Sequence, residues 1–132
     1  MKTLGLIFLI AKLSILSPDN VSRYINRHDI AHPNIVLAQT IQECGYSYDS
    51  YNARCRNNIC GMKGGEKDDD NKYGYAIYDH WFDSIRAYKH RQRTYVDGSY
   101  FDYLEESGYS ESKRYIADLK WHLLQMIGKI RL

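Results

Sequence analysis

Apolar positions recur with helical spacing along most of the chain, and capping residues mark where helices begin. Ser17 followed by Pro18 is typical of a helix start, so we expect a helix from there to about residues 27–29. A second helix is predicted to begin at His32-Pro33-Asn34 and to end at Gly45. Its residues 35–44 are apolar on most sides, which is typical of a helix in the middle of a domain.

The stretch 46–78 is rich in turns and carries the only strand-like pattern of the sequence. We expect one helical turn near Tyr51–Arg54 and an exposed, mobile loop over Gly64–Lys72, where two glycines precede a highly charged run. Tyr73–Tyr78 has the composition of a strand. This strand is predicted to pair with Ile59–Met62 as a small hairpin.

The last third of the chain predicts three more helices. Asp79 is expected to cap the first, which carries Trp81, Ile85 and Tyr88 on one face. After a turn at 97–99, a short helix over 100–106 is closed by Gly108, and Ser110 is predicted to cap the last helix. The predicted fold is therefore mainly α (α+β), a single domain over residues 17–132 with helices around one buried helix and a small β-hairpin lobe.

Residues 1–16 allow two interpretations. Lys2 precedes the apolar run Leu4–Ala11, which resembles a secretion signal or an uncleaved anchor. Lys12 interrupts the run, and no clear cleavage site follows it, so a first core helix is the alternative. The run is too short to span a bilayer as a helix, and we expect no stable membrane span.

Composition narrows the class of protein without naming a function. The 132 residues suit one domain, and 44% hydrophobic content is enough for a folded core. A net charge of +2 without a stripe of Lys and Arg argues against nucleic acid and is compatible with an anionic wall polymer. The 13 tyrosines suit a sugar-binding surface, because sugars have apolar faces and polar edges, or they are packing residues of the core.

The cysteines and histidines predict neither a disulfide framework nor a cofactor. Cys44, Cys55 and Cys60 are an odd number; Cys55 and Cys60 could pair in an oxidising compartment, or all three are half-buried thiols. The histidines are scattered and no metal-binding spacing occurs. The glycines at 61–65 lack the spacing of a phosphate-binding loop, so we expect no metal, nucleotide or redox cofactor.

Glu43 is the residue with the most unusual position for its chemistry. It lies in the last turn of the most apolar predicted helix, where burial and the negative end of the helix dipole would both raise the pKa of its carboxyl. A carboxylic acid that keeps its proton near neutral pH suits glycoside cleavage. The alternative is an ordinary glutamate that is solvated at a helix end.

Four segments in order resemble the bacterial glucosaminidase domain family, which includes the flagellar muramidase domain. The resemblance covers roughly residues 17–125, and shorter pieces such as Tyr-Ile-x-x-Leu-Lys near the end also fit. The four segments are Ile35–Gly45, which resembles the "LAQ…E-(S/T)-G" motif, Asn57–Lys63, Tyr75–Tyr78 and Trp81–Ile85.

The resemblance implies a lysozyme-like fold that cleaves the β-1,4 glycan backbone of peptidoglycan. It implies that Glu43 is the general acid and that Tyr78 lines the active site as a second catalytic residue. The other residues that it implies in substrate binding and in the floor of the site are Gln39, Asn57, Asn58, Gly61 and Tyr75. For the two asparagines, turn chemistry is an equal alternative.

The sequence departs from the family pattern in two ways. Cys60 stands where a bulky apolar residue is usual. The region that carries a second carboxylate in longer members is short here, and its candidates are Glu66 and Asp68, with Asp69 and Asp70 beside them, or else a solvated acidic loop. If one of them is the base, inversion is expected; if none is, the N-acetyl group of the sugar could assist.

The same residues allow other functions on the same polymer. A lytic transglycosylase also needs one acidic glutamate, and a non-catalytic wall-binding module could keep the cleft without the chemistry. The expected partner is the glycan strand of peptidoglycan, and the protein is expected to be a monomer. We expect it in the cell envelope or secreted, or else delivered by a phage or as a toxin.

Overall fold

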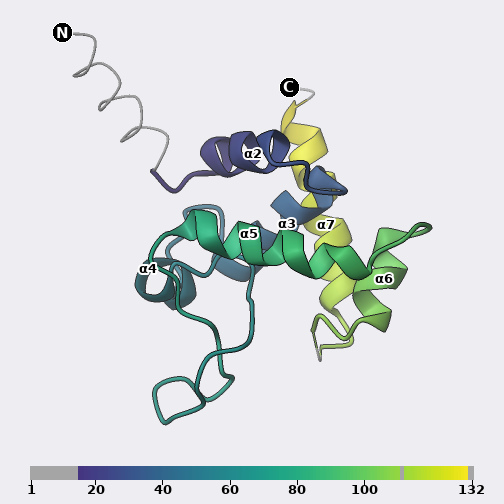
Figure 1. Ribbon diagram of the computed structural model, residues 1–132. Helices are drawn as coiled ribbons and strands as arrows, with labels where there is room; N and C mark the ends of the chain where they lie inside the picture. The colour runs from purple at the N-terminus through teal and green to yellow at the C-terminus, as the bar shows by residue number, and fades with distance from the viewer. Residues whose placement is uncertain (1–14, 111, 131–132) are drawn as a thin grey trace, which may run out of the picture.

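The structure is a computed structural model that describes residues 15–110 and 112–130, and its described part is mainly helical (Figure 1). The interpretations of residues 1–16 lie outside these ranges, apart from residues 15 and 16. None of the helices in the described ranges is long and apolar enough to cross a membrane. The elements in chain order are α2 Pro18–Arg27, α3 Pro33–Cys44, α4 Tyr51–Arg56, α5 Trp81–Arg91, the 3-10 helix η1 Gln92–Thr94, α6 Tyr100–Glu106 and α7 Tyr115–Ile130.

Local capping chemistry sets the ends of α2 and α3 as predicted. Ser17 Oγ accepts a hydrogen bond from the backbone N–H of Asn20 at 3.2 Å, and a proline follows at the first helical position. α3 also begins with a proline, and it ends at Gly45, whose φ of 78° requires a residue without a Cβ. Glu43 therefore lies in the last turn of α3, next to the point where the chain turns away.

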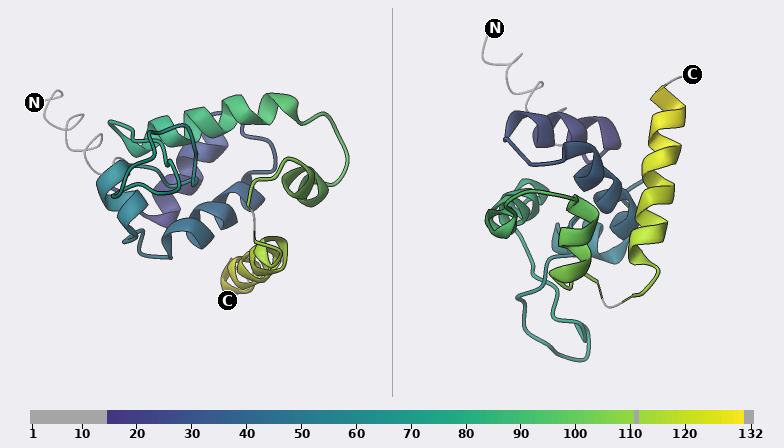
Figure 2. Two further views of the ribbon diagram at one scale, coloured as in Figure 1. Left: turned by 90° about the horizontal axis from the view of Figure 1, so that it is seen from below. Right: turned by 90° about the vertical axis from the view of Figure 1, so that its right-hand side faces the viewer.

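α3 is the central helix of the bundle, which confirms the prediction from its apolar pattern. It contacts α2, α4 and α7, and both views of Figure 2 place it between α5 and α7. Its buried residues are Val36, Ala38, Gln39, Thr40, Ile41 and Cys44. Full burial of a Val or Ile side chain contributes about 1.5–3 kcal/mol, so this helix is held in place by its neighbours on several sides.

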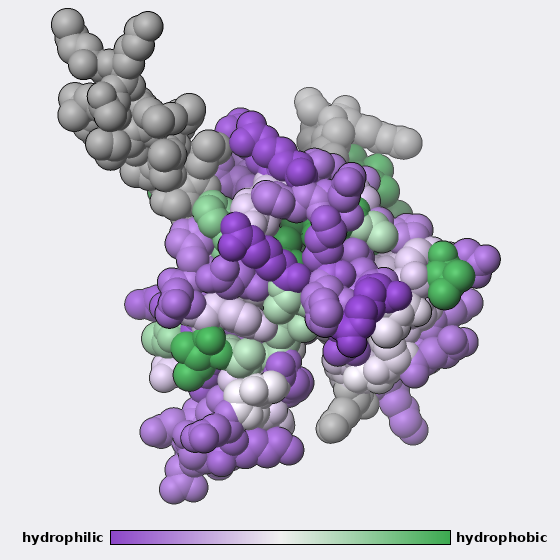
Figure 3. All heavy atoms as spheres, in the orientation of Figure 1, coloured by the Kyte–Doolittle hydropathy of each residue, from purple (hydrophilic) through white to green (hydrophobic). Residues whose placement is uncertain are grey.

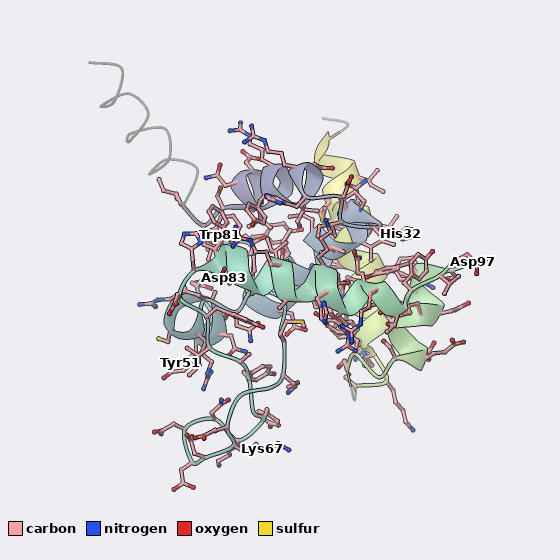
Figure 4. All side chains as sticks on the ribbon, in the orientation of Figure 1. His32, Tyr51, Lys67, Trp81, Asp83 and Asp97 are labelled. Atoms are coloured by element: carbon pink, nitrogen blue, oxygen red, sulfur yellow. The ribbon has the colours of Figure 1, made fainter. Side chains whose placement is uncertain are left out.

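Two of the predicted helix caps are wrong. α5 is capped by His80 and not by Asp79, because His80 Nδ1 accepts a hydrogen bond from Phe82 N at 3.1 Å. α7 begins only at Tyr115, and Ser110 Oγ accepts instead from Ser112 N in the preceding turn. Short polar side chains bind nearby backbone groups in turns as readily as at helix ends, so composition alone did not distinguish these positions. The predicted range of α6 and the buried face of α5, with Trp81 near α2 (Figure 4), are confirmed.

The predicted hairpin is reduced to isolated contacts. Within the described residues no regular strand forms between 57 and 78; two isolated antiparallel bridges join Lys63 to Tyr75 and Asp68 to Asn71. Three glycines of this segment, at positions 61, 64 and 74, have positive φ, which interrupts an extended backbone. The segment therefore projects from the bundle as an irregular loop (Figure 1).

Candidate active site

A cleft of about 670 Å³ lies between the loop at residues 63–75 and the beginning of α7. Its volume falls in the range of sites that bind small molecules. In the space-filling view the surface is hollowed between the lobe that carries this loop and the lobe that carries α6 (Figure 3). The lining residues used below are Gln42, Glu43, Gly61, Lys63, Lys67, Lys72, Tyr75, Arg91, Tyr109, Tyr115 and Asp118.

Glu43 and Gly61 meet in this cleft. The backbone of Gly61 lies directly against the carboxyl group of Glu43: a Cβ added to Gly61 would be 2.7 Å from the carboxyl carbon Cδ. Real Cβ atoms do not approach so closely, so any side chain at position 61 would displace the carboxyl group. Gly61 also has a φ of 65°, which favours glycine at this position.

Burial controls the charge of Glu43. Removal of its carboxyl from water raises its pKa above the ordinary value, and this effect is the largest. The hydroxyl of Tyr115, which donates to Glu43 Oε1 at 3.4 Å, and the positive charge of Lys63 oppose the rise. Burial, together with the nearby Glu43 carboxyl, raises the pKa of Tyr115 as well, so Tyr115 keeps its proton and remains a donor.

Gln39 does not line the cleft, and its role in substrate binding stays a prediction. Its side chain is fully buried behind Glu43. Gln39 Nε2 donates to the hydroxyl oxygen of Tyr115 at 3.2 Å, and the hydroxyl of Tyr88 donates to Gln39 Oε1. Gln39 therefore orients Tyr115, which in turn contacts Glu43.

The hydrogen bonds behind Gln39 continue across the core. The hydroxyls of Tyr88 and Tyr100 are 2.5 Å apart, and Gln92 Nε2 donates to the Tyr100 oxygen at 2.8 Å. Gln92 is fixed in turn by two hydrogen bonds to the backbone of Ala31. Because the hydroxyl of Tyr88 donates its hydrogen bond to Gln39, the Tyr100 hydroxyl must be the donor to Tyr88. Every hydrogen bond of the chain is therefore donated in the direction from η1 towards Glu43. Such a satisfied buried network holds its members in one arrangement.

Asn57 and Asn58 are also absent from the cleft lining, so the structure supports the turn interpretation of this pair. Asn57 has a left-handed backbone at the end of α4, and its Nδ2 donates to the carbonyl of Tyr78 at 3.0 Å. The buried Asn58 accepts from Met62 N and donates to the carbonyls of Met62 and Ala76. Both side chains hold the two ends of the loop together.

Asn71 repeats this arrangement inside the loop and was not singled out by the sequence. Its Oδ1 accepts from Tyr75 N, and its Nδ2 donates to the carbonyls of Tyr75 and Glu66. Asn71 thus binds both the backbone N–H and the carbonyl of Tyr75, four residues later, just as Asn58 binds both backbone groups of Met62. Hydrogen bonds from two asparagine side chains therefore hold the segment together in place of the predicted strand pairing. The pattern that the two asparagines share is a backbone partner four residues later, Met62 for Asn58 and Tyr75 for Asn71.

Of the two tyrosines predicted for the site, only Tyr75 lines the cleft. Lys63 Nζ lies 3.9 Å from the centroid of the Tyr75 ring, so a cation rests on this aromatic face. The side chain of Tyr78 is half-buried and is not part of the lining, while its backbone N–H donates to the carbonyl of Arg56. Tyr78 therefore lies outside the lining of this cleft, and its catalytic role stays a prediction.

Glu66 and Asp68 are exposed and do not line the cleft either. Asp68 Oδ1 accepts from Asp70 N at the tip of the loop, so this carboxylate is used in a turn. Among the described lining residues the carboxylate other than Glu43 is Asp118, on α7 one turn after Tyr115. Sequence reasoning missed Asp118, although the i, i+3 spacing from Tyr115 places both on one helix face.

The cysteines remain free thiols. Cys44 and Cys60 are buried and Cys55 is exposed, so the possible pair of Cys55 and Cys60 is not formed. Burial raises the pKa of Cys44 to about 12, which makes this thiol unreactive. Cys60 packs in the core, and its carbonyl accepts from the hydroxyl of Tyr109 at the cleft. In the part of the chain that is described, no group of three or more His, Cys, Asp or Glu residues is arranged to hold a metal ion.

The cleft brings together a half-buried carboxyl with a raised pKa, a tyrosine donor, an aromatic face and several cations. This arrangement is suited to acid catalysis on a polar polymer. The sequence model of the glucosaminidase family, described as mannosyl-glycoprotein endo-beta-N-acetylglucosaminidase, matches residues 19–127. The matched range contains every residue discussed for the cleft. No match was found among the curated proteins or among the solved structures.

Proposed function

The chain belongs to the glucosaminidase family, and from this we propose that it is a peptidoglycan hydrolase that cleaves β-1,4 bonds of the glycan backbone as an endo-β-N-acetylglucosaminidase. The observation that carries the proposal is the position of Glu43, whose half-buried carboxyl lies at the cleft, where burial favours its protonated form by raising its pKa. The mainly helical bundle, with this glutamate at the end of the central helix, supports a lysozyme-like fold for the domain at residues 17–132.

In the proposed reaction Glu43 donates its proton to the glycosidic oxygen as the bond from that oxygen to the anomeric carbon breaks. The positive charge that develops on the sugar is then quenched when water adds to the anomeric carbon, and a proton returns to the site. Tyr115 holds the Glu43 carboxyl through Oε1, so the second carboxyl oxygen, Oε2, is free to carry the proton. Gly61 leaves room for the carboxyl at the surface of the cleft.

Activation of the water needs a second group, and the cleft offers a new candidate. Glu66 and Asp68 lie away from it, whereas Asp118 lines it. If Asp118 is the base, Asp118→Asn lowers kcat by at least about 100-fold, the usual scale of acid–base catalysis, and the product is initially the α-anomer. If the N-acetyl group of the substrate assists instead, the variant keeps most of its activity and the product is initially the β-anomer. Nuclear magnetic resonance of fresh digests distinguishes the two.

The products of digestion test the proposed activity. We expect mass spectrometry of digested peptidoglycan to find fragments with reducing N-acetylglucosamine ends, because each cleavage adds one water to the combined mass of the two fragments. Fragments that end in an anhydro-sugar would instead indicate a lytic transglycosylase. Glycan that is bound but intact would indicate a binding module.

Two predictions from the sequence fit a cell-wall substrate and stay predictions. One is that residues 1–16 are a signal or anchor, and the other is that the protein is located in the envelope or outside the cell.

A further inference from the structure

The positively and negatively charged residues of the loop lie on different sides of it. Lys63, Lys67 and Lys72 line the cleft. The loop also carries four carboxylates, and none of them contributes to the lining; they are Glu66, Asp68, Asp69 and Asp70. In the sequence the two signs alternate within one short run, which predicts no preferred side. In the structure the loop presents its cations to the cleft and its anions to solvent.

Contacts within the loop keep its lysines and its carboxylates on these separate sides. The Asn71 side chain and the bridge from Asp68 to Asn71 close the tip, where the Asp68 carboxylate is held by Asp70 N. The aliphatic stem of Lys67 lies over Gly74, since a Cβ there would be 3.1 Å from Lys67 Cγ and 3.4 Å from its Cε. Lys67 lies on the edge of the loop that faces the lobe of α6 and α7 (Figure 4).

Among the described residues, none of the cleft cations forms an ion pair. Over residues 15–110 and 112–130 the one ion pair is between Arg86 and Asp83 on α5, away from the cleft. Lys63 rests on the ring of Tyr75, and at the other end of the cleft Arg91 rests on the ring of Tyr109, with its guanidinium carbon 4.7 Å from the ring centroid. These contacts with aromatic rings position the cations but leave their charge uncompensated.

We propose that Lys63, Lys67 and Lys72 form a subsite for carboxylate groups carried by the glycan. The inference rests on the proposed function and adds which glycan is preferred. In peptidoglycan such carboxylates come from two sources, the lactyl group of N-acetylmuramic acid where no peptide is attached, and the peptide stem where one is. An exposed ion pair of ordinary strength changes affinity by about 2-fold, so the three together favour an anionic glycan on the order of 10-fold.

The test compares kcat/KM for three soluble glycans with the same sugar backbone. One carries free lactyl carboxylates, the second has them converted to neutral amides, and the third carries peptide stems. We expect the wild-type chain to prefer the first or the third over the amide by about 10-fold, and the preferred one identifies the source of the carboxylate. The preference should shrink as salt is added, because exposed charges are screened. Equal kcat/KM values for all three glycans would overturn the subsite.

A double variant, Lys67→Gln with Lys72→Gln, locates the effect. Lys63 is left unchanged because its charge also acts on Glu43. We expect the ratio of kcat/KM between the anionic glycan and the amide to fall towards 1. The matched control, Lys89→Gln with Lys113→Gln, removes the same charge from exposed positions outside the cleft and should keep the ratio. An unchanged ratio in the first variant, or an equal fall in both, would refute the subsite. Failure of the wild type to cleave any of the three would refute the proposed function instead.

Discussion

The two sides of the cleft are built in opposite ways. On the helical side, Glu43 of α3 and Tyr115 of α7 are held by a buried hydrogen-bond network that reaches η1. On the loop side, the lysines are exposed and are held only by aromatic rings and asparagine-braced turns. A proton donor needs a fixed, dry position that raises its pKa, whereas a subsite for a polymer needs charge that water can reach. We therefore propose that the helical side carries the chemistry and that the loop side selects the substrate.

Glu43→Gln tests this division most severely, because it removes the proton and keeps the shape. We expect kcat to fall by at least about 100-fold, with the affinity for glycan retained on the loop side. The assay is release of reducing ends from purified peptidoglycan, with binding measured separately. Glu66→Gln is the matched control, since it removes an exposed carboxylate outside the cleft and should leave the rate unchanged. Equal losses in both variants would contradict the division.

Gly61→Ala disrupts the contact between Gly61 and Glu43, where the two sides of the cleft meet. The new Cβ would collide with the Glu43 carboxyl, which is the end of a flexible side chain, so the carboxyl moves while the fold survives. We expect kcat to fall by about 10- to 100-fold, since a displacement of about 1 Å can cost that much. The left-handed backbone costs about 1–2 kcal/mol of stability in addition.

The control for this strain is Gly98→Ala. Gly98 also has a positive φ, of 85°, but nothing lies within 4 Å of an added Cβ and the residue is outside the cleft. Gly98→Ala should therefore lose stability similarly and keep its rate. A comparable loss of rate in both variants would show that the contact with the carboxyl does not matter.

Tyr115→Phe sharpens the account of the helical side with a smaller effect. Without the hydroxyl that lowers it, the pKa of Glu43 should rise further, so the alkaline limb of the pH–rate profile moves to higher pH. We expect kcat to fall several-fold, and stability to fall by about 1–3 kcal/mol because the buried Gln39 Nε2 loses its acceptor. Tyr48→Phe also removes a buried hydroxyl, one that bonds Thr40, and should leave the pH profile in place.

Stability should also depend on Glu43, by a smaller amount. Its folded pKa is raised, so the folded state binds more protons than the unfolded state between the two pKa values. The contribution of Glu43 is therefore fully present below the unfolded pKa and is lost as pH rises through the folded pKa. We expect Glu43→Gln to have a higher Tm than the wild type at neutral pH and a smaller advantage near pH 4. A Tm difference that is constant with pH would contradict a raised pKa.

Local sequence signals predicted much of the bundle and part of the site. The ends of α2 and α3 follow from Ser17, the two prolines and Gly45, which act within one turn of the chain. Of the residues predicted for the site, Glu43, Gly61 and Tyr75 line the cleft. A sequence motif does not indicate which of its side chains face the cleft and which face the core. Gln39, from the same motif as Glu43, is buried between Tyr88 and Tyr115.

The loop was harder to predict because its structure depends on contacts between its two ends. Asn58 and Asn71 bind backbone groups that only the folded loop brings close, and they replace the expected strand pairing. The position of Lys67 over Gly74 follows from the same fold. The i, i+3 spacing places Asp118 on the same helix face as Tyr115, but this face borders the cleft only because α7 packs on α3.

The most direct test of the central claim is the titration of Glu43 itself. Nuclear magnetic resonance of the side-chain carboxyl carbons, with Glu43→Gln to assign the signal, gives the pKa of this group in the free protein. We predict a value above the ordinary range of glutamate that coincides with the alkaline limb of kcat/KM, because that limb reports the acid of the free enzyme. An ordinary pKa for Glu43, or an alkaline limb at a different pH, would contradict its role as the proton donor.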